Sequence, residues 1–198
     1  MWDERYAAAE GYLFGTAPSG FVTAEAGRLA PGSRVLCLAD GEGRNSVWLA
    51  GQGHEVTASE QSAVALGKAR ALADARGVSL RFVQEDIAQA SWPLAAFDAV
   101  FGVFIQFAPP DLRAAIHSGI ARCLVPGGLV FLHGYAPRQI ANGTGGPRAV
   151  ENLYTLEGLA GDFPGWTVLQ ARDYDADLAE GAGHHGKSAL IDFVARKP

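Results

Sequence analysis

The chain is poor in cysteine, with only Cys37 and Cys123 among its 198 residues. Two cysteines cannot build a disulfide framework or a cysteine-based metal cluster. Each lies within an apolar run, residues 35–38 and 120–124, where a cysteine serves as a small hydrophobic side chain. The sequence therefore predicts two buried thiols and no metal site.

Basic residues are also scarce, and no apolar segment is long. Sixteen lysines and arginines are scattered against 21 acidic residues, a net charge of −5, which disfavours a nucleic-acid partner. No apolar stretch approaches the roughly 18 residues of a membrane span. Residues 1–5, Met-Trp-Asp-Glu-Arg, are acidic and polar, whereas a signal peptide begins basic and then apolar. We expect a cytoplasmic protein with no membrane partner.

What the chain does contain is typical of one globular domain, which we expect to span residues 1–198. Its apolar content is 48% and its charged content 19%, enough to build a core. Short apolar runs alternate with longer amphipathic ones, the pattern of β-α units and a mainly parallel sheet. Strands are predicted at residues 34–38, 55–58, 78–83, 97–104, 129–133, 166–174 and 188–195. Helices are predicted at residues 44–50, 63–76, 109–124 and 149–159.

The last two predicted strands are joined by a loop containing Gly181, Gly183 and Gly186, without a crossover helix. Consecutive strands of this kind pair antiparallel if they are neighbours. The C-terminal part of the sheet should therefore differ from the rest.

A glycine-containing loop, residues 39–45, follows the first predicted strand and precedes a helix. Gly41 and Gly43 allow a sharp turn and a close approach of a ligand, and the helix N-terminus offers free N–H groups. Glu60, at the end of the second strand, is placed to accept hydrogen bonds from ribose hydroxyls, and Asp86, after the third strand, from an adenine amino group. Singly, these residues would equally serve a plain turn, a helix cap and a solvated loop; in this order they favour a nucleoside site.

The type of nucleoside follows from Ser46. A dinucleotide fingerprint has a third glycine at this position, close to a pyrophosphate. A sulfonium cofactor has no pyrophosphate, and the antiparallel C-terminal pair also departs from the repeated βαβ half of dinucleotide binders. Both features favour S-adenosylmethionine.

Several motifs resemble the class I S-adenosylmethionine-dependent methyltransferases, in particular the tellurite-resistance-type and thiopurine-methyltransferase-like branch. The run 36–46, Leu-Cys-Leu-Ala-Asp-Gly-Glu-Gly-Arg-Asn-Ser, is similar to their first motif. Residues 2–6, 14–18, 124–128 and 165–166 also resemble that branch. The resemblance covers essentially the whole chain. Together with the strand pattern it predicts an α/β, three-layer Rossmann-like sandwich whose seven-stranded, mainly parallel sheet has an antiparallel C-terminal strand, with cap helices in residues 1–30 and a lid loop at 135–149.

The resemblance also implies roles for individual residues. Ala39, Gly41 and Gly43 would line the methionine end of the cofactor, Glu60 would hold the ribose, and Asp86 would bind the adenine with Ile87 against the ring. Val103 and Phe104 would face the sulfonium, and Trp2 would close over the cofactor. The full expected cofactor set is Trp2, Ala39, Asp40, Gly41, Gly43, Asn45, Glu60, Gln61, Asp86, Ile87, Val103 and Phe104. Two positions depart from the family, because Cys37 stands where many relatives have an acid and Ala39 replaces the first glycine.

On the acceptor side, the catalytic candidates are His133, Tyr135 and His184. His133 and Tyr135 end the fifth strand; the alternative for His133 is a structural histidine bonded to backbone. His184 lies between the last two strands, and its neighbour His185 points away in an extended chain, so a metal site is disfavoured. The loop at 142–147 would be a lid or an ordinary surface loop.

The leading hypothesis is therefore methyl transfer to a small-molecule acceptor, a thiol or another chalcogen, because a soft nucleophile needs no strong base. Amino-directed nucleic-acid methyltransferases carry an Asn/Asp-Pro-Pro-aromatic tetrad, and residues 108–111, Ala-Pro-Pro-Asp, lack both of its ends. Two alternatives stay open. One is a nicotinamide-dependent oxidoreductase, and the other is a regulator that binds S-adenosylmethionine without catalysis.

Overall fold

The computed structural model describes residues 2–181 and 183–198. The chain divides into two compact units, each described below by itself. The first unit comprises residues 1–90 and 180–184, and the second comprises residues 91–179 and 185–198. The strands form one seven-stranded sheet in the order β3-β2-β1-β4-β5-β7-β6, which confirms the predicted α/β fold class. The prediction of a single domain over residues 1–198 stays a prediction.

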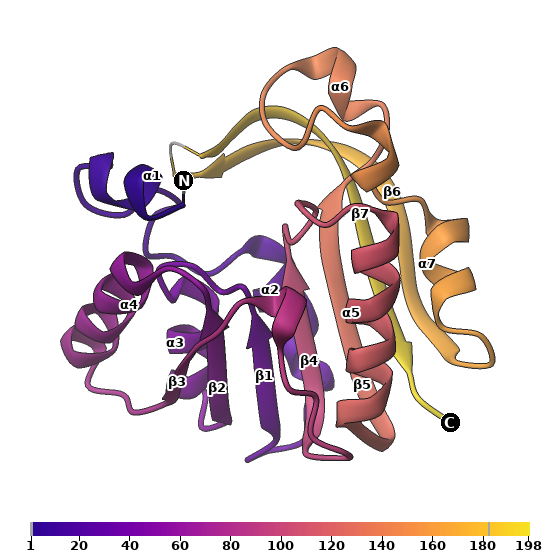
Figure 1. Cartoon of the computed structure of the whole chain (residues 1–198), viewed down its shortest axis with the longest axis horizontal. Helices are drawn as coiled ribbons and strands as arrows, with labels where there is room; N and C mark the ends of the chain where they lie inside the picture. The colour runs from indigo at the N-terminus through magenta and orange to yellow at the C-terminus, as the bar shows by residue number, and fades with distance from the viewer. Residues whose placement is uncertain (1, 182) are drawn as a thin grey trace. The chain divides into compact units, whose positions relative to one another are not determined.

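The sheet of the first unit consists of β1 (Arg34–Leu38), β2 (Glu55–Glu60) and β3 (Arg81–Gln84), which are parallel. Cys37 is paired with Ala58, and Glu60 with Gln84, so the strands end at the same edge. Parallel strands place the residues that follow them side by side at that edge. The ends of these strands lie at one edge of the sheet (Figure 1). The predicted glycine-containing loop after β1 and Glu60 at the end of β2 therefore lie at this edge.

Helices of the first unit are α1 (Trp2–Ala8), α2 (Gly20–Glu25), α3 (Arg44–Gly51) and α4 (Ala63–Arg76), with short 3-10 helices η1 (Ala26–Arg28) and η2 (Ile87–Gln89). Two helices thus lie within the predicted cap region. The bounds predicted for α4 are confirmed, since the Ser62 hydroxyl caps its start by accepting from Ala65 N–H and Gly77 ends it at φ 64°. Helix α4 packs on α1, α3, β2 and β3.

Strand β3 is shorter than predicted, because it begins at Arg81 and not at Val78. The end of α4 explains the difference. Val78 N–H donates to Ala73 O at 3.1 Å, and Gly77 N–H donates to Asp74 O at 3.1 Å. These bonds satisfy the last carbonyls of the helix and keep Val78 out of the strand ladder.

The second unit contains β4 (Phe97–Val103), β5 (Leu124–Tyr135) and most of β6 (Thr167–Glu180) and β7 (His184–Arg196). Strands β4 and β5 are parallel, with Val100 paired to Val130, whereas β5 and β7 are antiparallel, with His133 paired to Asp192. The predicted change of direction in the C-terminal strands is confirmed.

Three of the strands, β5, β6 and β7, have other bounds than predicted. Strand β5 starts at Leu124, directly after α5 (Pro110–Cys123), although its pairing with β4 is irregular between Phe97 and Ala99. Strands β6 and β7 are longer than predicted, so that His184 and Gly186 lie in a strand and not in a loop.

The helix predicted at residues 149–159 is interrupted. It is replaced by the 3-10 helix η3 (Val150–Asn152) and helix α7 (Leu156–Asp162). Tyr154 N–H donates to Tyr135 O at 2.9 Å, and the Thr155 hydroxyl accepts from Gly158 N–H to start a new helix. A short helix, α6 (Gln139–Asn142), lies within the predicted lid loop.

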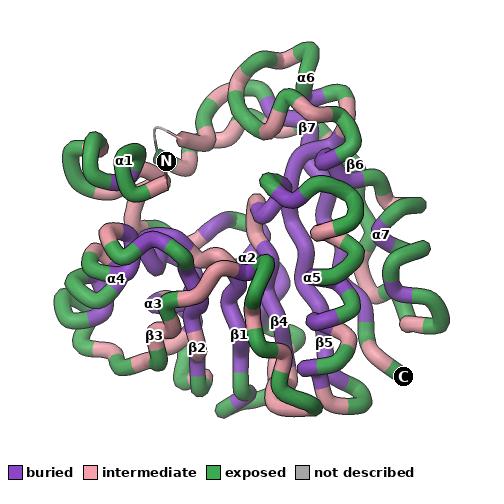
Figure 2. Tube along the Cα trace, in the orientation of Figure 1, coloured by how far each residue is buried: buried purple, intermediate pink, exposed green. Residues whose placement is uncertain are grey.

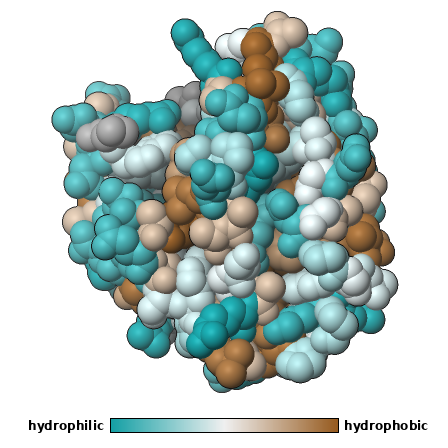
Figure 3. All heavy atoms as spheres, turned by 45° about the vertical axis from the view of Figure 1, so that its right-hand side comes forward, coloured by the Kyte–Doolittle hydropathy of each residue, from teal (hydrophilic) through white to brown (hydrophobic). Residues whose placement is uncertain are grey.

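Buried residues follow the strands in both units, most visibly along β1 and β5 (Figure 2). Cys37 and Cys123 are buried free thiols, as predicted. In the described part of the chain, no helix has the length and apolarity needed to cross a bilayer. On the face shown in Figure 3, hydrophobic atoms are interspersed with hydrophilic ones.

Candidate functional site

The loop after β1 has an unusual backbone. Ala39, Gly41 and Gly43 have positive φ angles of 45°, 63° and 87°. An alanine in this region is strained by roughly 1–2 kcal/mol, and strain of this kind concentrates at functional sites. Three residues of the loop therefore have left-handed backbone conformations before helix α3 begins at Arg44.

Glu60, at the tip of β2, connects this loop to the next one. Its Oε2 accepts from Gly41 N–H at 2.9 Å, and its Oε1 accepts from Ser62 N–H at 2.8 Å. The side chain is buried, and burial raises the pKa of its carboxyl group although these N–H groups oppose the shift. Each carboxylate oxygen has two lone pairs, so Glu60 keeps acceptor capacity for hydroxyl groups of a ligand.

Asp40 lies in the same loop, partly buried. Its Oδ2 accepts from the Ser46 hydroxyl at 2.5 Å. Burial raises the pKa of Asp40 to about 7; the Ser46 hydrogen bond opposes this shift and the charge of Glu60 adds to it. The serine that replaces the third glycine of a dinucleotide fingerprint therefore holds a loop carboxyl group.

Gly43 serves packing as well as backbone conformation. A Cβ atom built on it would lie 2.7 Å from Ala69 Cβ and 3.0 Å from Ala69 Cα of helix α4. Real Cβ atoms do not approach so closely. This glycine lets the start of α3 lie directly against α4.

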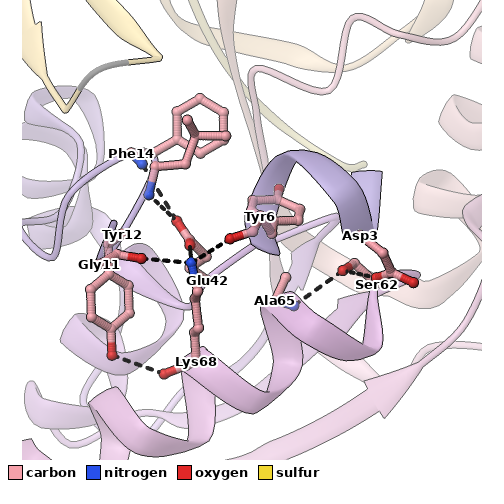
Figure 4. A network of polar contacts seen from close by, with 10 residues as sticks. Asp3, Tyr6, Gly11, Tyr12, Phe14, Glu42, Ser62, Ala65 and Lys68 are labelled. Carbon is pink, nitrogen blue, oxygen red and sulfur yellow. Dashed lines mark hydrogen bonds and ion pairs between the residues drawn. The ribbon is translucent and has the colours of Figure 1, made fainter. Parts of the chain in front are cut away.

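A polar network holds the N-terminal segment of the first unit, residues 6–14, beside this loop (Figure 4). Glu42 accepts from the backbone N–H groups of Leu13 at 2.7 Å and Phe14 at 3.4 Å, and pairs with Lys68 Nζ at 2.9 Å. Lys68 Nζ also donates to the carbonyls of Tyr6 and Gly11, both at 2.6 Å. Sequence reasoning missed Glu42 and Lys68, because a carboxylate in a loop and a lysine on a helix carry no distinctive pattern.

Helix α1 places an aromatic side chain over the loop. The Tyr6 hydroxyl would lie only 2.8 Å from a Cβ on Gly41, and the Tyr6 ring is stacked on Trp2 with a centroid distance of 5.7 Å. Asp3, one turn away, accepts from the Ser62 hydroxyl at the start of α4. Burial and three nearby carboxylates raise the pKa of Tyr6 far above its ordinary value, so it stays a neutral phenol. Trp2 is half-buried at this position.

Other expected cofactor residues of the first unit lie on neighbouring elements. Asp86 follows β3, half-buried, and its Oδ1 caps η2 by accepting from Ala88 N–H at 2.9 Å; Ile87 beside it is buried. Gln61 is exposed. Asn45 is buried, and its Oδ1 accepts from Ser19 N–H at 2.9 Å, so it ties α3 to the start of α2.

In the second unit, Val103 ends β4 and Phe104 follows it, both half-buried. Phe104 has a φ of 58°, and its ring lies edge-on to His133 with a centroid distance of 4.7 Å. His133 is buried, with Nδ1 2.7 Å from Asp192 Oδ1. Tyr135 is buried, and its backbone N–H and carbonyl both bond to the Gln106 amide, at 2.5 and 2.8 Å.

The third catalytic candidate, His184, belongs to the first unit. Its ring is stacked on Phe14 with a centroid distance of 4.5 Å and an interplanar angle of 23°. Gly183 N–H donates to Leu13 O at 3.1 Å, and Glu180 accepts from Ser19 and Gly20 while pairing with Arg44 at 2.8 Å. The turn between β6 and β7 is thereby attached to the N-terminal segment.

These features fit an adenosyl sulfonium. The loop is built for close approach, because its backbone is left-handed and a side chain on Gly41 would collide with Tyr6. A buried carboxylate, Glu60, and a half-buried one, Asp86, stand at the ends of consecutive strands. Oxygen acceptors and backbone N–H groups are the groups that a nucleoside and an amino-acid moiety require.

Comparison with known proteins supports this interpretation. Residues 35–128 match the family model described as a methyltransferase domain. No curated protein sequence matches the chain. Among solved structures, one concerns the conversion of a disulfide bond into a thioacetal group during echinomycin biosynthesis. It has a TM-score of 0.81 and 21% sequence identity, and the alignment covers 99% of this chain and 90% of that chain.

Two further structures are similar over most of the chain. TehB from Haemophilus influenzae has a TM-score of 0.75 and 18% identity, with 100% of this chain and 67% of that chain covered. A SAM-dependent methyltransferase from Methanosarcina mazei has a TM-score of 0.73 and 17% identity, with 91% and 98% covered. Residues 35–128 therefore match a methyltransferase domain, and the chain has the fold of SAM-dependent methyltransferases.

Proposed function

We propose that the protein transfers the methyl group of S-adenosylmethionine to a small molecule whose acceptor is a soft atom, a thiol or another chalcogen. The observation that carries the proposal is the bond from Gly41 N–H to Glu60 Oε2 at 2.9 Å. It links the glycine loop after β1 to a buried carboxylate at the tip of β2. A loop and a carboxylate joined in this way can hold the two ends of an adenosyl amino acid.

The proposed cofactor contacts follow the family pattern. Glu60 accepts from the ribose hydroxyls, Asp86 accepts from the adenine amino group, and Ile87 packs against the ring. Ala39 and Gly41 present backbone to the methionine moiety, while Trp2 covers the cofactor. In the second unit, Val103 and Phe104 are the residues expected nearest the sulfonium.

Three residues of the expected set are better explained as supports of the loop. Gly43 is packed against Ala69, Asn45 bonds to Ser19, and Asp40 bonds to Ser46. Their side chains or Cα atoms already have protein partners. We propose that they shape the loop, while its backbone contacts the cofactor.

S-adenosylmethionine supplies an electrophilic methyl group with an excellent leaving group. The chain contributes alignment and exclusion of water, and alignment alone can be worth about 7–11 kcal/mol. Tyr6 adds to the exclusion of water, since it is a buried neutral phenol packed on the loop.

Proteins with this fold carry out different chemistry. One similar structure concerns the conversion of a disulfide bond into a thioacetal group, another is the N-methyltransferase NodS and a third is the [4+2]-cyclase SpnF. The first concerns sulfur chemistry, and its chain aligns over 99% of this one. A net charge of −5 supports a small-molecule acceptor over a nucleic acid.

The test combines binding with turnover. Calorimetry should show that the purified protein binds S-adenosylmethionine and S-adenosylhomocysteine, and thermal shifts should be smaller with NAD. A panel of thiols, selenols, phenols and amines should then release S-adenosylhomocysteine with the thiols and selenols preferred. Absence of binding would refute the proposal, and binding without any methylated product would identify a non-catalytic regulator.

A further inference from the structure

A polar cluster of the second unit lies on one face of strands β5, β7 and β6, which are neighbours in the sheet (Figure 1). His133 and Asp192 are cross-strand partners, with His133 Nδ1 2.7 Å from Asp192 Oδ1. The Tyr174 hydroxyl donates to the same Oδ1 at 3.2 Å, and Arg172 Nη1 lies 3.7 Å from Oδ2. His133 and Asp192 are 2% and 3% exposed, so the pair is nearly removed from water.

This arrangement determines where the imidazole carries its proton. An ionised carboxylate only accepts hydrogen bonds, so the short contact requires that Nδ1 carry the proton. In the neutral imidazole the lone pair is then on Nε2. The Tyr174 hydroxyl also donates to Asp192 Oδ1 and Arg172 lies beside Oδ2, so the carboxylate is held in the orientation that fixes this tautomer.

The same face becomes apolar towards the other end of these strands. Tyr135, Leu153 and Leu190 are buried together, and Phe104, Tyr174, Ala176 and Leu178 pack against them while only partly buried. Tyr174, Ala176 and Leu178 alternate along β6 and therefore point to one face. A half-buried apolar surface adjoins a buried histidine–carboxylate pair.

We propose, on the basis of the proposed function, that His133 is the general base of the reaction and Asp192 its positioning residue, and that the acceptor is a thiol carried on an apolar body. The sulfur gives its proton to Nε2 of His133 and uses the electron pair so released to bond the methyl carbon. The bond from that carbon to the sulfonium breaks, its electron pair stays on the departing sulfur of S-adenosylhomocysteine, and His133 later returns its proton to water.

The chemistry matches the acceptor class. A thiol has a pKa near 8.5, so a weak base such as imidazole is sufficient to ionise it near neutral pH, whereas a telluride or selenide needs no base. Because the imidazole is buried, binding of the acceptor requires that the Phe104 ring move away from it. That ring is half-buried and is therefore in part exposed to solvent.

The test compares two apolar thiols that differ in ionisation at pH 7. Benzyl mercaptan is protonated and needs the base, whereas 4-nitrothiophenol is already a thiolate. His133→Gln should lower kcat/KM about 100-fold or more for benzyl mercaptan and by less than about threefold for 4-nitrothiophenol. Asp192→Asn should also lower kcat/KM mainly for benzyl mercaptan, but by a smaller factor, since it weakens the preference for this tautomer without removing the base.

A matched control is present in the same unit. His117 is also 2% exposed, and its Nδ1 lies 2.8 Å from Asp162 Oδ2. His117→Gln should change kcat/KM for both thiols by the same factor, as expected of a structural residue. Thermal unfolding of each variant should show that it is folded.

The outcomes separate the two proposals. The role of His133 would be overturned if the folded His133→Gln and Asp192→Asn proteins lost activity toward both thiols by the same factor, or lost no activity toward either. Methyl transfer itself would still be established. If the unmodified protein fails to bind S-adenosylmethionine in calorimetry, the proposed function itself fails, and the inference with it.

Discussion

Glu42 and Lys68, 26 residues apart, form an ion pair of 2.9 Å that joins the loop after β1 to helix α4. The Glu42 side chain is 2% exposed and that of Lys68 23%, so the pair is largely shielded from water. Each partner also bonds to backbone of residues 6–14. Folding of the N-terminal segment onto the loop is therefore coupled to this pair.

Replacing Glu42 by glutamine should lower the free energy of unfolding by roughly 2–3 kcal/mol, because it leaves the Lys68 ammonium group without its charge partner. Urea unfolding measures the change. Asp173→Asn is the control: it breaks an ion pair with Arg138 in which the two side chains are 46% and 43% exposed, and should cost well under about 1 kcal/mol. Equal losses in the two variants would contradict the special role of Glu42.

Gly43→Ala should destabilise the protein by about 3 kcal/mol, from left-handed strain and collision with Ala69. Gly53 provides the comparison, since its φ is 88° but nothing lies within 4 Å of a Cβ atom placed on it. Gly53→Ala should therefore cost only the strain, about 1 kcal/mol. Urea titrations of both variants give the packing contribution as the difference, and a difference near zero would show that α3 and α4 can separate without cost.

The raised pKa of Asp40 predicts a pH-dependent stability. Between its ordinary value of 3.8 and about 7, the folded protein binds more protons at this site than the unfolded chain does. The contribution of the neutral carboxyl group is complete below pH 3.8 and is lost as the pH rises through 7. Asp40→Asn should consequently be more stable relative to the unmodified protein at pH 8 than at pH 5, by at least about 1.4 kcal/mol, the value of one pKa unit.

Urea unfolding of both proteins at pH 5, 6, 7 and 8 measures this difference. Since Glu60 titrates in both proteins, its contribution largely cancels in the comparison. A constant difference across this range would mean that Asp40 ionises normally in the folded state.

Glu60→Gln should weaken binding of S-adenosylmethionine at least about tenfold, because an amide replaces an acceptor that already orients Gly41 and Ser62. Isothermal titration calorimetry gives the affinity. Glu55→Gln, at the exposed start of the same strand, should bind normally. Unchanged affinity in the folded Glu60 variant would remove the central residue of the proposed cofactor site.

The local sequence determined most of the elements. Ser62 and Gly77 set the two ends of α4 because a hydroxyl cap and a left-handed glycine act within one helical turn. The continuous apolar run of β1 and the glycines after it predicted a buried strand and a sharp loop, and both are present. Glu60 was placed correctly at the end of β2, since a parallel strand delivers the residue at its carboxyl end to one edge of the sheet.

Tertiary structure decided the partners of those residues. The pairing of Glu42 with Lys68, the contact of Gly43 with Ala69, and the contact of His133 with Asp192 join residues 26, 26 and 59 positions apart. Tertiary structure also interrupted the helix expected at 149–159, because the Tyr154 N–H group donates to the Tyr135 carbonyl instead of to a helical partner. Such contacts depend on strand register and helix packing, which a one-dimensional pattern of residue types does not encode.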